Sequence, residues 1–227
     1  MFIKNSYYAL TFRLTALAVC VSGVFRHLSF SDTAHNKHMF SFFTIQSNLL
    51  CTVLFGYFVV DTLSEMQTGN IYPYRYNNPF LRGVCLSSIF VTFVIFQFVL
   101  KRSDFSMYSG VNGKISINDI FVHYLVPFST VIDWMLFQPK GQWNLKQPLY
   151  WLIMPFCYFC FTMVRGLFVT DSYPYFFLDI KTAGLGKFTF YTLVLLALFI
   201  VFSYIFTFAD RFLYMISVKA PSHHKLQ

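Results

Sequence analysis

Residues Met39–Val60 read MFSFFTIQSNLLCTVLFGYFVV, an apolar run that contains no charged side chain. About 20 mostly apolar residues in a helix are enough to cross the hydrocarbon core of a bilayer. The start of this run is unusual, because four of the seven residues in Phe42–Asn48 are polar. On a helix, Thr44 shares a face with Ser47 and Asn48. We expect that face to point at other helices, with Ser47 and Asn48 in supporting or substrate-binding roles.

The whole chain has the composition of a membrane protein. Of its 227 residues, 56% are hydrophobic and only 11% are charged, whereas a soluble domain carries about 25% charged residues. Six apolar runs are long enough to span a bilayer, at approximately 6–24, 39–60, 80–100, 115–137, 147–169 and 188–209. We therefore predict an all-α integral membrane protein, a bundle of six transmembrane helices in a single transmembrane domain over residues 1–227.

The distribution of charge argues against a nucleic-acid-binding protein. The net charge is +8, but Lys and Arg are scattered at the ends of the apolar runs, as topology signals and headgroup anchors are. Their slight excess on the side of the termini predicts that both termini are cytoplasmic. The five cysteines all lie in apolar runs, where we expect them to pack as small hydrophobic side chains.

The fourth apolar run is the most polar of the six. Its polar residues have spacings of 3, 4, 7 and 3, which places them on one face of a helix. They are Ser116, Asp119, His123, Thr130 and Asp133. Pro127 has no N–H to bond the carbonyl of His123, so we expect a kink and a free carbonyl at that point.

Polar groups from three runs are predicted to lie at one depth. The second and fourth helices start on the same face of the membrane, and the fifth ends there. Thr44, His123 and Arg165 then lie roughly 6–12 Å below that boundary at 1.5 Å per residue. Asn48 and Asp119 bracket the same layer. These side chains are therefore candidates for one interior pocket.

The residue types in this layer match covalent acyl transfer. Thr44 is the candidate nucleophile, which needs a base to take its proton, and His123 is the candidate base. Asp119 lies four residues before His123 and is placed to orient the imidazole. Asn48 is a candidate donor to a developing oxyanion. Arg165 is a candidate for binding a lipid carboxylate or headgroup.

The same residues also have structural interpretations. A threonine within a helix often bonds its own i−4 carbonyl, which would explain Thr44. His123 can serve in interhelical hydrogen bonding, Asp119 can cap the start of its helix, and Arg165 can extend to the headgroups. The sequence leaves both sets of interpretations open.

Two other groups of polar residues are expected to have no chemical role. Arg13 and Asp133 lie at similar depths from the opposite boundary, and we predict that they form a structural ion pair. His27, His35 and His38 lie in one loop, but their spacing is not specific for a metal. We predict no metal site and no cofactor.

Several short motifs of the chain occur together in one known family. They are Phe43-Thr44 at the start of the second run, His123 and Pro127 in the fourth, and Arg165 followed by Tyr173-Pro174. With the six-span layout, which covers most of the chain, they resemble the androgen-induced protein family. The stretch Phe43–Asn48, with Asp133-Trp134, is most similar to the bacterial members of that family.

This resemblance implies a function and a location. The animal members are membrane-embedded threonine-dependent hydrolases that cleave fatty acid esters of hydroxy fatty acids. The resemblance thus implies that Thr44 is the nucleophile, that His123 is its partner and that the substrate is a fatty acyl ester in the inner membrane of a bacterium. The loops and the run Gln46–Asn48 differ from the animal members, which leaves the natural ester, and hydrolysis against acyl transfer, open.

Two functions of other classes remain as alternatives. In a small transporter or proton-coupled permease, the intramembrane ionisable residues would line a pathway. They are Arg13, Asp119, His123, Asp133 and Arg165. In a non-catalytic scaffold, the same side chains would be paired and no pocket would remain. The sequence does not determine the oligomeric state.

Overall fold

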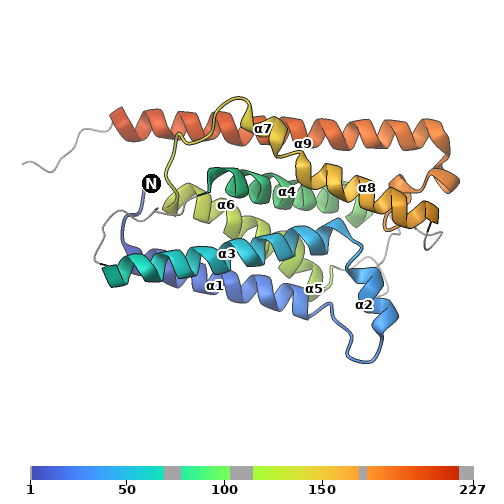
Figure 1. The fold of residues 1–227 in the computed structure, drawn as a ribbon, viewed down its shortest axis with the longest axis horizontal. Helices are drawn as coiled ribbons and strands as arrows, with labels where there is room; N and C mark the ends of the chain where they lie inside the picture. Colours follow the sequence, from blue (N-terminus) through green and yellow to red (C-terminus); the bar gives the residue numbers. More distant parts are fainter. Residues whose placement is uncertain (1, 69–77, 103–114, 169–172, 220–227) are drawn as a thin grey trace, which may run out of the picture.

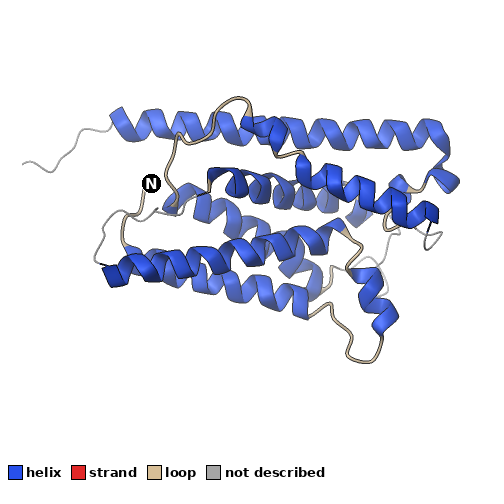
Figure 2. Ribbon diagram, viewed as in Figure 1, coloured by secondary structure: helices blue, strands red, loops and turns tan. Residues whose placement is uncertain are grey.

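The chain folds into a bundle of membrane-length helices (Figures 1 and 2). The computed structural model describes residues 2–68, 78–102, 115–168 and 173–219, and within these ranges it contains helices and loops but no strand. In this described part of the chain, six helices are long and apolar enough to cross a membrane. The predicted all-α bundle of six spans is therefore confirmed.

The helices follow the predicted runs, with different ends. Five spans are α1 (Ser6–Phe25), α3 (Phe43–Thr68), α4 (Pro79–Phe98), α8 (Ile153–Phe168), which follows the short α7 (Gln147–Tyr150), and α9 (Ile180–Lys219). The fourth span consists of α5 (Ile117–Ile120), the π-helical turn η2 (Phe121–Leu125) and α6 (Val126–Phe137). Short elements outside the spans are α2 (Thr33–Met39), η1 (Leu100–Arg102) and η3 (Phe176–Leu178).

The second and last spans differ most from the predicted bounds, and the second continues to Thr68 instead of ending at Val60. The second span starts at Phe43 instead of Met39, because the preceding residues form α2, whose N-terminus is capped by the Asp32 side chain. The last helix, Ile180–Lys219, is kinked at Gly184, whose backbone is non-helical (φ 74°, ψ 157°). The part after the kink has about 35 residues and is roughly 52 Å long, well beyond the thickness of the hydrocarbon core. The predicted bounds mark only the apolar part of each helix. The helical hydrogen bonds continue into the more polar residues on either side, so the observed helix is longer.

Helix α4 lies at the centre of the bundle. It packs against α3 and α6 on one side and against α8 and α9 on the other (Figure 1). Gly83 allows the close approach of the fifth span, because a Cβ at this position would lie 2.0 Å from the Trp151 ring. Helix α1 packs along α3 and α6. The start of α1 and the end of α9 lie at the same end of the bundle, as six spans require (Figure 1).

The predicted distortion at His123 takes the form of a π-helical turn. Within η2, the Val126 N–H bonds the carbonyl of Phe121, five residues back. Pro127 follows immediately and contributes no N–H. Such turns are frequent at functional sites, and this one carries the buried His123 side chain toward the neighbouring helices.

Candidate active site

Thr44 is placed by the way α3 begins. The chain leaves α2 through tight turns, in which Ser41 N–H bonds His38 O and Phe42 N–H bonds Met39 O. Thr44 is then the second residue of α3, where the backbone N–H has no carbonyl four residues back within the helix. Because the helix starts at Phe43 and not at Met39, Thr44 lies nearer the end of the bundle than predicted.

The partner of Thr44 is Tyr175, from the segment between α8 and α9. The Tyr175 hydroxyl lies 3.3 Å from Thr44 Oγ1 and accepts a hydrogen bond from the Thr44 N–H at 3.4 Å. The ring stacks on Phe177 at 4.9 Å and meets the edge of Phe42 at 5.3 Å. Burial raises the pKa of Tyr175 above its ordinary value, so the phenol keeps its proton at neutral pH and is available as a hydrogen-bond donor.

Tyr175 was missed in the sequence because no local pattern identifies it. It lies 131 residues from Thr44, outside every apolar run, and next to the Tyr173-Pro174 motif noted for the family resemblance. A pairing over that separation depends on how the fifth and sixth spans pack against the start of α3.

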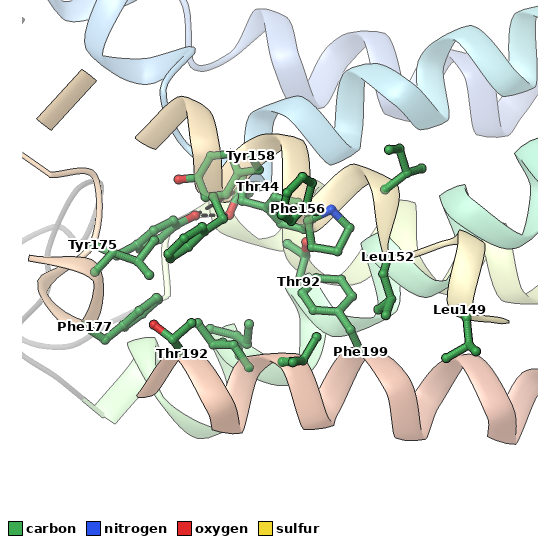
Figure 3. Close-up of a pocket in the computed structure, with 18 of the residues that line it drawn as sticks. Thr44, Thr92, Leu149, Leu152, Phe156, Tyr158, Tyr175, Phe177, Thr192 and Phe199 are labelled. Atoms are coloured by element: carbon green, nitrogen blue, oxygen red, sulfur yellow. Dashed lines mark hydrogen bonds between the residues drawn. The ribbon is translucent and has the colours of Figure 1, made fainter. Parts of the chain in front are cut away.

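Thr44 and Tyr175 line a cavity of about 750 Å³ between α8, α9 and the central α4 (Figure 3). This volume is in the range of pockets for small ligands. Phe, Leu and Ile side chains form most of the wall, and the described lining residues include no Asp, Glu, Lys, Arg or His. Thr44, Tyr158 and Tyr175 lie together toward one end, and Leu149 lies at the other (Figure 3).

The cavity extends to the outer surface of the bundle. Ile153 and Phe156 on α8 and Leu196 on α9 line it and are exposed on that surface. Helix α9 packs against α4, α7 and η3. Residues of both α8 and α9 line the cavity. A mouth lined by exposed apolar side chains opens toward lipid in a membrane-spanning bundle.

His123 lies near this site but outside the cavity wall. Its ring is buried and stacks on Phe96 at 3.8 Å, and its Nδ1 has no hydrogen-bond partner. Within the described part of the chain, it makes no hydrogen bond to Thr44 or to Asp119. The predicted pairing of Thr44 with His123 is therefore not present as a direct hydrogen bond.

Asn48 connects these two regions. Its amide nitrogen donates to the Thr44 carbonyl at 2.7 Å and to the Val122 carbonyl at 3.1 Å. Val122 is the residue before His123, so Asn48 fixes the start of α3 to the π-helical turn. Both amide protons are used in these bonds. The predicted role of Asn48 as an oxyanion donor is therefore not the one it has in this structure.

Ser47 also supports the backbone at Thr44. Its hydroxyl donates to the Thr44 carbonyl and pairs with Thr92 Oγ1, both at 3.0 Å. Ser47 and Asn48 are fully buried and do not line the cavity. Their supporting role is therefore to hold the first turn of α3 in place.

Asp119 does not orient the imidazole as predicted. Its carboxylate accepts hydrogen bonds from the N–H and the hydroxyl of Ser116, at 3.1 and 2.8 Å, and closes a capping box at the start of α5. The helix-capping interpretation is the one observed, because a carboxylate at the third position of a helix reaches back to the cap residue more readily than forward to residue i+4.

Arg165 is half-buried on α8 and does not line the cavity. Its charge, after the larger effect of burial, contributes to lowering the pKa of His38. Arg165 therefore lies close enough to α2 to affect His38, and it is not part of the apolar wall of the cavity.

The predicted ion pair between Arg13 and Asp133 is confirmed. Arg13 Nε donates to Asp133 Oδ1 at 2.9 Å, and Arg13 also donates to Thr62 Oγ1 at 2.7 Å. The other carboxylate oxygen of Asp133 accepts from Gln138 at 2.5 Å. This buried network joins α1, α3 and α6 and lies apart from the cavity lining.

Comparison with known proteins assigns no family to the chain. No family model matches it, and no curated protein or solved structure matches it either. Functional interpretation therefore depends on the motifs quoted above and on the geometry of the cavity.

Proposed function

We propose that this protein is a membrane-embedded fatty acyl ester hydrolase in which Thr44 is the nucleophile. The observation that carries the proposal is the position of the Thr44 hydroxyl, in the wall of a lipid-facing apolar cavity and 3.3 Å from the Tyr175 phenol. An acyl chain fits the apolar wall, and its ester group then lies beside the two hydroxyls. The threonine-dependent hydrolases that the motifs resemble perform the same class of reaction.

In the proposed first step, Thr44 Oγ attacks the ester carbonyl carbon. A C–O bond forms to Thr44, the carbonyl π electrons move to the carbonyl oxygen, and the hydroxyl proton passes to the His123 imidazole. His123 makes no direct hydrogen bond to Thr44, so in this mechanism it reaches the hydroxyl through a water or by a side-chain shift on substrate binding. Hydrogen bonds of this kind often tighten only in the substrate complex.

Tyr175 donates a hydrogen bond to the oxyanion in this mechanism. When the intermediate collapses, the ester C–O bond breaks and the leaving alkoxide takes the proton from His123. Water then attacks the acyl-Thr44 ester, again with His123 as base, and releases the fatty acid and the free hydroxyl. No group outside the chain and water is required for the balance of atoms and protons.

Labelling with a fluorophosphonate tests the nucleophile. Thr44→Ala is expected to abolish labelling and ester hydrolysis of the purified protein, Thr44→Ser to retain both, and His123→Ala to reduce both by about 10²-fold or more. Thr52→Ala is the matched control, since its hydroxyl bonds the Asn48 carbonyl on the same helix and does not line the cavity. Labelling that persists in Thr44→Ala contradicts the proposal.

A further inference from the structure

Among the described residues that line the cavity, one buried side-chain hydroxyl has no hydrogen-bond partner. Thr192 Oγ1, on α9, is buried and has no partner. Thr92 and Tyr158 donate to the carbonyls of Ser88 and Ser41, at 3.0 and 3.1 Å. A buried hydroxyl without a partner is costly unless a ligand completes its bonding.

Thr192 and the Thr44–Tyr175 pair approach the cavity from different elements. Thr192 projects from α9, on the opposite side from Thr44 at the start of α3 (Figure 3). If the small polar group of a ligand lies between them, it has the Thr192 hydroxyl on one side and the Thr44 and Tyr175 hydroxyls on the other. Beyond it, Leu152, Phe156 and Phe199 form an apolar wall suited to a hydrocarbon chain.

The polar part of the cavity offers hydroxyls only. The described lining contains no cation that would pair with a carboxylate or a phosphate, and Arg165 and His123 are both outside it. An anion transferred from water to such a site loses its hydration and finds no opposite charge. An ester carbonyl or an alcohol loses much less and gains hydroxyl partners.

We propose that this cavity selects lipids whose polar group is uncharged, namely acyl esters and long-chain alcohols, over fatty acid carboxylates and lipid phosphates. The inference rests on the proposed function, because it specifies the substrate class of the same site. For hydrolysis it has a consequence: the ester substrate binds well, whereas the ionised fatty acid product is expelled from the cavity.

Competitive binding to the purified full-length protein in detergent micelles tests this selection without turnover. The bound probe is a pyrene-labelled long-chain alcohol, and the competitors are methyl palmitate, hexadecanol and palmitate. At alkaline pH, the ester and the alcohol are expected to displace the probe at least about tenfold more strongly than palmitate. Palmitate is expected to gain affinity as the pH falls and its carboxyl group becomes protonated. Equal or tighter binding of ionised palmitate overturns the inference.

Substitutions on α9 test the contact. Thr192→Val removes the hydroxyl without breaking a bond within the protein, and is expected to weaken alcohol and ester binding about five- to tenfold. Thr207→Val is the matched control, since Thr207 bonds Ser203 O on the same helix and does not line the cavity. Thr192→Lys introduces a cation and is expected to improve palmitate binding. If Thr192→Val binds the alcohol and the ester as tightly as the wild-type protein, the proposed contact of the ligand with the Thr192 hydroxyl is overturned.

The same proteins separate this inference from the proposed hydrolysis. Ester cleavage that survives in Thr44→Ala overturns the hydrolase proposal, while a measured preference for uncharged ligands still supports the inference. An inactive Thr44→Ala combined with equal binding of ionised palmitate overturns the inference alone. Failure of the probe to bind the wild-type protein overturns the lipid site itself.

Discussion

Thr44 owes its position in the cavity wall to the first turn of α3. Its N–H and hydroxyl both face the Tyr175 phenol, while Ser47 and Asn48 hold its carbonyl from the other side. The polar stretch that stands out in the sequence is therefore divided between two tasks. Thr44 lines the cavity, whereas Ser47 and Asn48 fix the backbone of the first turn.

Removing the Tyr175 hydroxyl tests its proposed role as a hydrogen-bond donor to the oxyanion. Tyr175→Phe keeps the ring stacked on Phe177 but removes the hydroxyl, so kcat for ester hydrolysis is expected to fall about 10²- to 10³-fold, the usual cost of one oxyanion donor. KM is expected to change little. Steady-state kinetics with a soluble acyl ester measure both constants.

The control for this substitution is Tyr158→Phe. Tyr158 also lines the cavity, but its hydroxyl donates to the Ser41 carbonyl, so its removal is expected to lower kcat only a few-fold. An equal loss of kcat in the two variants would show that Tyr175 acts through packing and not as a donor.

Helix α4 packs closely against the fifth span at Gly83. Gly83 faces the Trp151 ring, and Trp151 in turn meets the edge of Trp143 at 5.0 Å. This contact sets the position of the fifth span against α4 at one end of the cavity. The absence of a side chain at Gly83 is thus a condition for the shape of the site.

Gly83→Ala is expected to destabilise the protein by about 1–3 kcal/mol, as overpacking of a buried contact does. Its new Cβ would lie 2.0 Å from the Trp151 ring, so the ring or the helix must shift. Gly56→Ala in α3 is the control, because nothing lies within 4 Å of its Cβ, and it is expected to be neutral or slightly stabilising. Thermal unfolding in detergent compares the two, and equal melting temperatures would contradict this account.

For the ion pair between α1 and α6, the loss of stability is expected to be larger when one partner is removed than when both are removed. Asp133→Leu leaves the Arg13 charge buried and is expected to cost about 3–5 kcal/mol. The double variant Arg13→Met and Asp133→Leu is expected to regain most of that loss, since neither charge remains. Denaturant unfolding of the single and double variants measures the difference. A double variant as unstable as the single one would contradict the pairing argument.

The bundle as a whole leaves its cavity open toward lipid. Arg13 and Asp133 pair with each other away from the cavity, and the described residues that line this cavity carry no charge. A lateral mouth between α8 and α9 suits a substrate that arrives from the bilayer. This arrangement is the one that the proposed lipid hydrolase requires.

Narrowing the mouth is expected to affect long substrates most. Leu196→Trp on α9 fills space at the exposed end of the cavity, and is expected to lower kcat/KM for a long-chain ester roughly tenfold, a typical effect of a changed apolar pocket. A short-chain ester is expected to lose much less. Leu193→Trp is the control, since Leu193 is exposed on the same helix and does not line the cavity. A similar loss for both variants would contradict the lateral route.

The membrane class, the six spans, the distortion near Pro127 and the pairing of Arg13 with Asp133 could all be predicted from the sequence. These features follow from local composition and from the helical period, which give each residue a depth and a face. The contact of Thr44 with Tyr175, the capping role of Asp119 and the position of the cavity between α8 and α9 became evident in the folded protein alone. The rotation of each helix about its axis and the pairing of distant segments arise from side-chain packing, which a periodic pattern along one helix does not encode.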